Sequence, residues 1–177
     1  MYADYATLPK SDLVLVTHEH GDHLDLKAIQ AVSKSGTVVI VNPGSAKGIP
    51  NATVMKNGDT KIIEGLKIEA VPAYNIEKPF HPKGNGNGYV LTFGDKRVYA
   101  AGDTENVPEI KTLKNIDVAF LPMNLPYTMT PEQVADVAKA IRPPILYPYH
   151  FGNTDPNVLV NLLKDEKGIE VRVRKLN

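Results

Sequence analysis

Short apolar runs separated by turn-forming residues dominate this chain and predict a protein rich in β-strands. The runs are enriched in Val, Ile, Leu and Tyr, and Gly, Pro, Asn or Asp bounds them. Asn57-Gly58-Asp59 and Gly94-Asp95 predict hairpin turns, and Glu64-Gly65 predicts a further turn. We expect strands at residues 12–17, 37–41, 53–56, 60–64, 66–71, 88–93, 96–101, 117–121, 145–149 and 169–174.

Apolar positions with helical spacing are fewer. Residues 24–34 carry apolar side chains at positions 24, 28, 29 and 32, which predicts an amphipathic helix before Gly36. Thr130-Pro131-Glu132-Gln133 is a capping box with proline at the first helical position, and it predicts a helix to about Ile141. Further helices are expected over residues 107–113 and 155–164. Strands in the first half and alternating strands and helices in the second indicate an α/β protein with mixed sheets covered by helices.

The composition limits the classes of protein to which this chain can belong. Its 177 residues are enough for a single domain over residues 1–177 with a substantial core. The 20 Lys and Arg residues balance 20 Asp and Glu residues, and zero net charge argues against a nucleic acid as the main partner. The absence of cysteine excludes disulfide bonds and thiolate zinc sites. Without a signal-peptide pattern or an apolar stretch of ~18 residues, we expect a cytoplasmic protein that acts on a small molecule and not on a membrane.

The segment His18-Glu19-His20-Gly21-Asp22-His23 carries the strongest chemical signal. It follows an apolar run and brings three imidazoles and the Asp22 carboxylate into a stretch of six residues. Neutral imidazole and carboxylate are the usual ligands of Zn²⁺ and similar divalent ions. His18 and His20 alternate along the chain and can reach one metal, whereas Asp22 and His23 follow the flexible Gly21 and can reach a second metal ~3.5–4 Å away. The alternative is a polar surface loop that happens to contain three histidines.

Three later segments can complete such a site. Two expected strands end in Gly102-Asp103-Thr104 and at His150, and α/β proteins often place site residues after strand ends. Taken alone, Asp103 fits a turn aspartate and His150 fits a core histidine. The metal-binding pattern of residues 18–23 is what favours a ligand role for both. His81 opens the Gly-rich segment 81–88, for which we expect a mobile loop that offers Lys83 to an anionic substrate group. A phosphate cradle is the alternative there, although Walker spacing is absent from the sequence.

Together these motifs resemble those of the metallo-β-lactamase-fold superfamily. Its signature His-x-His-x-Asp-His is matched by residues 18–23, and Gly102-Asp103-Thr104 is similar to the segment with its metal-bridging aspartate. His150 resembles the final ligand, and the match in order and spacing extends over nearly the whole chain. Residues 101–105 and 120–124 look like the metal-dependent hydrolase branch that includes L-ascorbate-6-phosphate lactonase-like proteins. The resemblance implies an αβ/βα sandwich of two mixed sheets.

The resemblance also implies a dinuclear zinc site, with Mn²⁺ as the alternative metal. The first metal would take His18, His20 and a third histidine, and the second would take Asp22, His23 and His150, with Asp103 between them. Superfamily members often carry the third histidine shortly after the strand that ends here at Ala73, where this chain has Tyr74 and Asn75. His81 is the only remaining histidine of the chain, and we expect it to act as the replacement.

A second departure concerns the N-terminus. Superfamily members usually begin with paired strands before the metal signature, which starts here after 17 residues. We therefore expect the sandwich to lack its first N-terminal strands. An exposed sheet edge favours pairing with another chain, so we also expect a homo-oligomer.

These residues predict a hydrolase in which a metal-bridging hydroxide attacks an ester, lactone, amide or phosphodiester. Asp22 would ligate a metal and orient the nucleophile, and a metal-bound water or the His150 side would protonate the leaving group. Tyr127 either contacts the substrate or is a buried core residue. One alternative is a di-iron oxidoreductase of the same fold, although such members use a carboxylate where His20 stands. The other is a degenerate, non-catalytic metal-binding protein, which the displaced third histidine and the short N-terminus favour.

Overall fold

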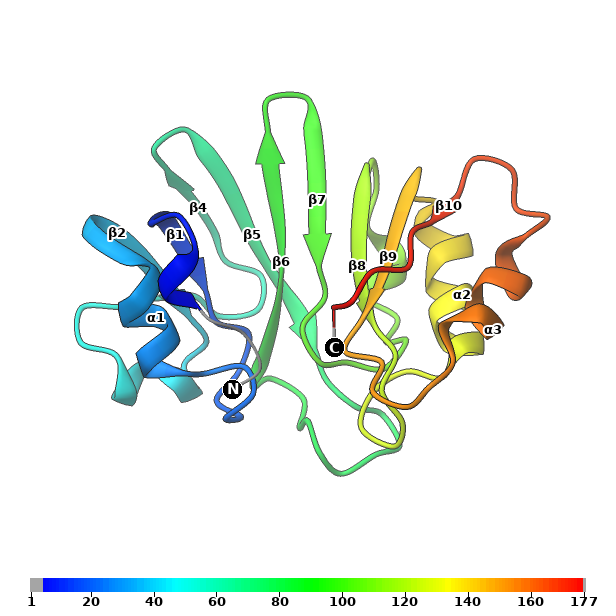
Figure 1. The fold of residues 1–177 in the computed structure, drawn as a ribbon, viewed down its shortest axis with the longest axis horizontal. Coiled ribbons are helices and arrows are strands. Elements are labelled where there is room, and N and C mark those ends of the chain that lie inside the picture. Colours follow the sequence, from blue (N-terminus) through cyan, green and yellow to red (C-terminus); the bar gives the residue numbers. More distant parts are fainter. Residues whose placement is uncertain (1–4, 177) are drawn as a thin grey trace. The chain divides into compact units, whose positions relative to one another are not determined.

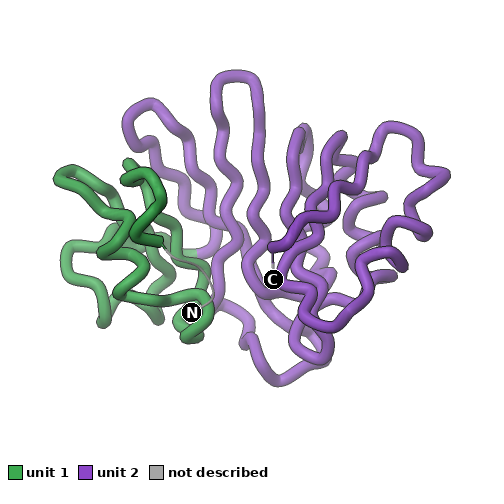
Figure 2. The backbone as a smooth tube through the Cα atoms, in the orientation of Figure 1, with its two compact units in different colours: residues 1–56 green, residues 57–177 purple. Residues whose placement is uncertain are grey.

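The computed structural model describes residues 5–176 and divides the chain into two compact units, residues 1–56 and residues 57–177 (Figure 2). Each unit contains one β-sheet and its own cluster of buried apolar residues. Helices accompany both sheets, so the α/β class expected from the sequence is confirmed (Figure 1). The single domain expected over residues 1–177 stays a prediction. Among the described residues, no helix is both long and apolar enough to cross a membrane.

The first unit is built on a parallel sheet of three strands in the order β1-β2-β3. The helix α1 connects β1 to β2, because parallel strands need a crossover that returns the chain to the same end of the sheet. Val16, Val41 and Ile49 form its buried cluster. The elements are η1 (Tyr5–Thr7), β1 (Ser11–Leu15), α1 (Leu26–Val32), β2 (Ser33–Val41), η2 (Gly44–Gly48) and β3 (Thr53–Val54).

Helix α1 is shorter than the sequence predicted, because the chain becomes extended at Ser33. The Asp25 side chain caps the N-terminus by accepting hydrogen bonds from the backbone N–H groups of Lys27 and Ala28. At the other end, the Ser33 hydroxyl donates to the carbonyl of Ile29 over 2.7 Å, and Ser33 itself has extended φ and ψ. Pairing of Ser33 with Ser11 of β1 then overrides the helical spacing of residues 24–34.

The second unit is built on a mixed sheet of seven strands in the order β10-β9-β8-β7-β6-β5-β4. Strands β4 to β7 form an antiparallel meander, and β7 to β10 run parallel to one another. The strands expected from the sequence are all present, with ends shifted by a few residues. The elements are β4 (Thr60–Ile63), β5 (Leu66–Ala73), β6 (Gly86–Phe93), β7 (Lys96–Ala100), η3 (Ile110–Thr112), β8 (Val118–Pro122), α2 (Pro131–Ile141), β9 (Ile145–Tyr149), α3 (Pro156–Leu163) and β10 (Glu170–Val171).

Two of the three predicted turns behave as expected. Glu64 and Gly65 both have positive φ, as a two-residue turn of type I′ requires, and they join β4 to β5. Gly94 also has positive φ and begins the turn between β6 and β7. The hairpin predicted at Asn57-Gly58-Asp59 is wrong, because the strands on either side of it, β3 and β4, belong to different sheets.

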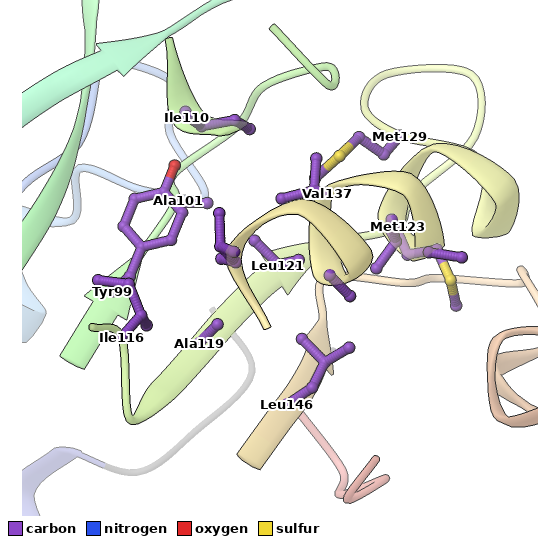
Figure 3. Packing of buried hydrophobic residues seen from close by; sticks show 14 of the residues in the cluster. Tyr99, Ala101, Ile110, Ile116, Ala119, Leu121, Met123, Met129, Val137 and Leu146 are labelled. Atoms are coloured by element: carbon purple, nitrogen blue, oxygen red, sulfur yellow. The ribbon is translucent and has the colours of Figure 1, made fainter. Parts of the chain in front are cut away.

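The core of the second unit lies between the parallel strands and α2. Figure 3 shows Val137 of α2 near Leu121 of β8 and Met129, with Leu146 of β9 nearby. The predicted capping box is present: Thr130 Oγ1 accepts from the Gln133 N–H, and Gln133 Oε1 accepts from the Thr130 N–H. A fixed helix start keeps the apolar face of α2 on the sheet.

Only residues 81–85 of the Gly-rich segment form a loop, because β6 begins at Gly86. Gly86 and Gly88 lie in β6, where they are buried and pair with Ala73 and Val71 of β5. A Cβ atom at Gly88 would lie 2.7 Å from the carbonyl oxygen of Ala101, so only glycine lets these backbones approach. These glycines therefore serve close packing within the sheet.

Gly88→Ala is expected to lower the free energy of unfolding by about 1–3 kcal/mol, because its methyl group would meet a backbone carbonyl that cannot move aside. Urea denaturation measures the change. Gly48→Ala is the control, since its Cβ would have nothing within 4 Å. Equal stability of the two variants would contradict the close approach of β6 to Ala101.

Candidate metal centre

The loop between β1 and α1 carries the metal signature of the first unit. The Val16 N–H donates to the carbonyl of Ile40, which continues the pairing of β1 with β2 up to the loop. The loop ends at Asp25, the N-cap of α1. His18 to His23 therefore follow the carboxyl end of a parallel strand, where open α/β sheets commonly bind ligands.

Three imidazoles gather within this loop. The ring centroid of His18 lies 4.6 Å from that of His20 and 4.2 Å from that of His23. The backbone causes this, because the N–H groups of His23 and Leu24 both donate to the carbonyl of His20 and fold the segment back on itself. The arrangement can present several nitrogen ligands from a single turn.

Thr17 contacts two of these histidines, and sequence reasoning did not single it out. Its hydroxyl oxygen lies 3.0 Å from Nδ1 of His18 and 3.4 Å from Nδ1 of His23. A hydroxyl oxygen has two lone pairs and can accept from both Nδ1–H groups, which would direct both Nε2 lone pairs to a metal. The only sequence signal was a hydroxyl residue between an apolar run and the first histidine.

The two carboxylates of the loop have different surroundings. Asp22 is half exposed, and its Oδ2 lies 3.6 Å from Nε2 of His23. Glu19 instead accepts a hydrogen bond of 3.1 Å from the side chain of Asn42, which is fully buried just beyond β2. A cavity of about 200 Å³ borders the loop and is lined by Tyr5, Val14, Leu15, Val16, Asp22, His23, Asp25, Ala28, Ile29 and Val32.

In the second unit, Asp103 lies between two histidines. Its Oδ2 is 3.4 Å from Nε2 of His81, and its Oδ1 is 3.2 Å from Nδ1 of His150. The Asp103 and His81 side chains are only 3% and 6% exposed, whereas His150 is 22% exposed. The structure therefore brings the three site residues predicted in this unit together around one buried carboxylate.

The backbone on either side of this group has unusual conformations. Gly102, which precedes Asp103, has a φ of 67° and turns the chain after β7. His150 follows β9 with a φ of 47°, which is uncommon for a residue other than glycine and often marks functional sites. Its N–H donates to the carbonyl of Leu176 over 2.8 Å, so the C-terminal segment helps to hold this conformation.

Asn75, which stands near the usual place of the third histidine, positions His81. Its Oδ1 accepts from the His81 N–H over 2.9 Å and lies 2.6 Å from His81 Nδ1. The Asn75 N–H in turn donates to the His81 carbonyl over 2.8 Å. An amide oxygen can only accept, so Nδ1 carries the proton in a neutral ring, and Nε2 faces Asp103 with its lone pair.

Thr104 and Glu105, directly after Asp103, attach the loop that carries Asn75 and His81. The Thr104 hydroxyl accepts from the Tyr74 N–H over 3.1 Å, and the Glu105 N–H donates to the Tyr74 carbonyl over 2.9 Å. Residues that flank one site residue thus hold the segment that presents another. The sequence indicated Asp103 as a site residue but gave no signal for this second role.

The Glu105 carboxylate extends this attachment although it is almost fully buried. It accepts hydrogen bonds from the backbone N–H groups of Ile76 and Glu77, and it pairs with the ammonium group of Lys78. Burial alone would raise the pKa of Glu105, but the hydrogen bonds from Lys78, Glu77 and Ile76 outweigh it and lower the pKa below 4.5. Glu105 is therefore a charged group that fixes the loop.

Lys83, which the sequence predicted as a cation for an anionic substrate group, contacts a carboxylate and an aromatic ring of its own unit. Its ammonium group is 3.1 Å from the Glu109 carboxylate and 4.7 Å from the centre of the Tyr74 ring. Hydrogen bonds with Tyr74 and Glu109 raise its pKa. The positive charge of Lys83 is thus paired with groups of the protein itself.

Comparison with known proteins identifies relatives of this arrangement. A family described as "Beta-lactamase superfamily domain" matches residues 2–150. A UPF0173 metal-dependent hydrolase from Methanopyrus kandleri is 33% identical over 158 residues, which cover 82% of this chain and 68% of that protein. The crystal structure of a candidate metal-dependent hydrolase from Parabacteroides distasonis has a TM-score of 0.95 and 56% identity, covering 99% of this chain and 81% of that chain.

A more distant structure shows the same fold. The metallo-β-lactamase fold protein YhfI from Bacillus subtilis is 15% identical, with a TM-score of 0.76, and the match covers 99% of this chain and 79% of that chain. Likeness at this identity concerns the fold alone. The two-sheet fold that the resemblance implied is therefore confirmed.

Glu105→Gln is expected to lower the free energy of unfolding by about 1–3 kcal/mol, because it leaves the Lys78 charge without its buried partner. The glutamine oxygen can still accept from the two backbone N–H groups, so the variant isolates the ion pair. The measurement is chemical denaturation, with the exposed Glu77→Gln as the matched control. A loss of equal size in both variants would refute a special role for Glu105.

Proposed function

We propose that this chain holds two metal ions and cleaves an ester or lactone bond in a small molecule. The chain belongs to the metallo-β-lactamase superfamily and is a metal-dependent hydrolase. The observation that carries the two-metal proposal is the pair of short contacts at Asp103. One histidine nitrogen lies beside each oxygen of its carboxylate, at 3.4 and 3.2 Å. A carboxylate that bridges two metals needs one oxygen for each metal, together with the other ligands of that metal.

The donor chemistry of both units fits divalent metal ions. His18, His20 and His81 would hold the first metal, Asp22, His23 and His150 would hold the second, and Asp103 would be shared between them. Five imidazoles and two carboxylates make a nitrogen-rich set, which favours Zn²⁺ over Mn²⁺. Thr17 and Asn75 support this assignment. Thr17 contacts Nδ1 of His18 and Asn75 contacts Nδ1 of His81, so each of these rings would bind metal through its Nε2 atom.

The charges of this set suit hydrolysis. Two carboxylates offset only half of the charge of two divalent ions, so the loaded site stays positive where a transition state becomes an oxyanion. When bound, the metals polarise the scissile carbonyl and lower the pKa of a water toward neutrality. Asp22 is half exposed and would orient the attacking water by accepting a hydrogen bond from it. A water at the partly exposed side of the His150 ring would supply the proton to the leaving group.

Lactones and carboxylic esters are the first substrates to test. The lactonase-like branch that residues 101–105 and 120–124 resemble supports lactones. Phosphodiesters are a weaker candidate, because the Lys83 ammonium group is already paired with Glu109. The cytoplasmic location and the homo-oligomer expected from the sequence stay predictions. For an oligomer, the edge strand β4 is the candidate contact, since its Ile62 is 72% exposed.

Elemental analysis of protein purified without chelator and reconstituted with Zn²⁺ tests the site. We expect two zinc ions per chain in the parent and about one in His81→Ala, because the first metal would lose one of its histidines. Lys83→Met is the control and should keep two, since Lys83 lies against Glu109. One zinc in the parent would contradict the dinuclear site. No zinc after reconstitution would contradict both metal sites.

Asn75→Ala is expected to weaken zinc binding about 10–100-fold, because His81 would lose the acceptor that fixes its ring and tautomer. Asn75→Asp is the matched variant, since it keeps an oxygen for the His81 contacts and replaces the donor to the Tyr127 carbonyl with a carboxylate oxygen. Competition with a chromophoric chelator measures both affinities. Equal weakening by both variants, or a fall only in the stability of the metal-free chain, would contradict a positioning role.

A further inference from the structure

Two loops of the second unit expose an apolar surface next to His81. We define the apolar platform as Ile76 and Phe80, from the loop after β5, with Leu125 and Tyr127, from the loop after β8. These side chains are 58%, 37%, 45% and 44% exposed in that order. Phe80 directly precedes His81, so the platform begins beside a proposed metal ligand. The buried tyrosine considered as an alternative for Tyr127 is therefore wrong.

The platform is preorganised in the absence of any ligand. The rings of Phe80 and Tyr127 pack edge to face, with centroids 4.9 Å apart and an angle of 66° between planes. The Asn75 side chain joins the two loops, because it donates to the Tyr127 carbonyl over 3.1 Å and accepts from His81. The aromatic pair is thus tied through one residue to the group that holds the proposed metal ligand.

The loop after β8 is itself held in place. The N–H groups of Tyr127 and Thr128 both donate to the Asn124 carbonyl over 2.8 Å, and the Asn124 N–H donates to the Thr128 hydroxyl over 2.7 Å. Gly152 lies so close that a Cβ there would be 2.8 Å from Asn124 Oδ1. A rigid exposed aromatic surface loses little conformational entropy when it binds a ligand.

The two cations of the same segment are paired with carboxylates. Lys78 pairs with Glu105, and Lys83 pairs with Glu109 and lies over the Tyr74 ring. Both lysines of the loop after β5 therefore have carboxylate partners. The surface left beside His81 is apolar and aromatic, with its nearby cations already compensated.

We propose that the apolar platform binds an uncharged aryl group of the substrate, next to the bond that is cleaved. This specificity rests on the proposed esterase or lactonase function and narrows it to neutral substrates with an aromatic substituent. An aryl group would stack on Tyr127 and Phe80 while the scissile carbonyl faces the Asp103 group. Sugar phosphates, which carry neither an aryl group nor a neutral charge, are disfavoured by the same surface.

The test compares benzyl acetate with methyl acetate on the zinc-loaded full chain. We expect Phe80→Ala and Tyr127→Ala each to lower kcat/KM for benzyl acetate about tenfold, and to leave the value for methyl acetate within about twofold. Phe93→Ala is the matched control, because Phe93 is 53% exposed at the opposite end of β6 and should change neither value. Equal losses on both esters, or no loss on benzyl acetate, would overturn the proposal.

A binding measurement separates this proposal from the proposed function. N-benzylacetamide carries the aryl group but an amide in place of the ester, and saturation-transfer NMR reports its contact with the chain. Binding to the parent that Tyr127→Ala abolishes supports the platform even if neither ester is hydrolysed, in which case the ester chemistry fails alone. Hydrolysis of methyl acetate without such binding refutes the platform and leaves the proposed function standing.

Discussion

The buried carboxylate of Asp103 is the constraint on which the second unit is built. A carboxylate that water scarcely reaches costs several kcal/mol unless charges or hydrogen-bond donors compensate it. Here its side chain is 3% exposed, and a histidine nitrogen lies near each of its oxygens. In the proposed site, two metal ions would supply the remaining compensation. The strands β7 and β9 deliver Asp103 and His150, and a long loop after β5 has to deliver His81.

That loop is where most of the local interactions are concentrated. A loop of this length would be costly to order by apolar contacts alone, since Ile76 and Phe80, two of its three large apolar side chains, are exposed. Backbone and side-chain hydrogen bonds from Thr104 and Glu105 fix its start, and Asn75 fixes the orientation of His81. The segment from Gly102 to Glu105 thus has two roles. The Gly-Asp-Thr-Glu segment offers one ligand and anchors the chain that offers another.

The same hydrogen bonds and ion pairs shape what the surface can recognise. Glu105 and Glu109 pair with the two lysines of the loop, so these lysine charges stabilise the loop itself. What stays exposed beside His81 is the apolar platform. Positive charge for a transition state would then come from metal ions, and affinity for the rest of the substrate would come from aromatic contact. This division of roles links the stability of the loop to the proposed specificity.

The sequence by itself determined the secondary structure and the chemical identity of the candidate ligands. Strand runs, the Thr130 capping box and the Glu64-Gly65 turn depend on neighbours within a few residues, so local patterns were enough to predict them. The six-residue metal signature is also local, and its meaning lies in the residue types. At the end of α1 and at Gly86 and Gly88, a strand pairing overrode the local rules. At Asn57-Gly58-Asp59 they failed because the flanking strands joined different sheets.

Only the tertiary structure decided how the ligands are held. Asn75 acts on His81 through a bend of the loop, Thr17 reaches His23 across a turn, and Lys83 meets Glu109 from 26 residues away. Such contacts depend on where the backbone carries each side chain, and composition and periodicity contain no record of that. Short motifs therefore indicated the candidate ligands of this protein, whereas packing and hydrogen bonds between distant segments decided how those ligands are held.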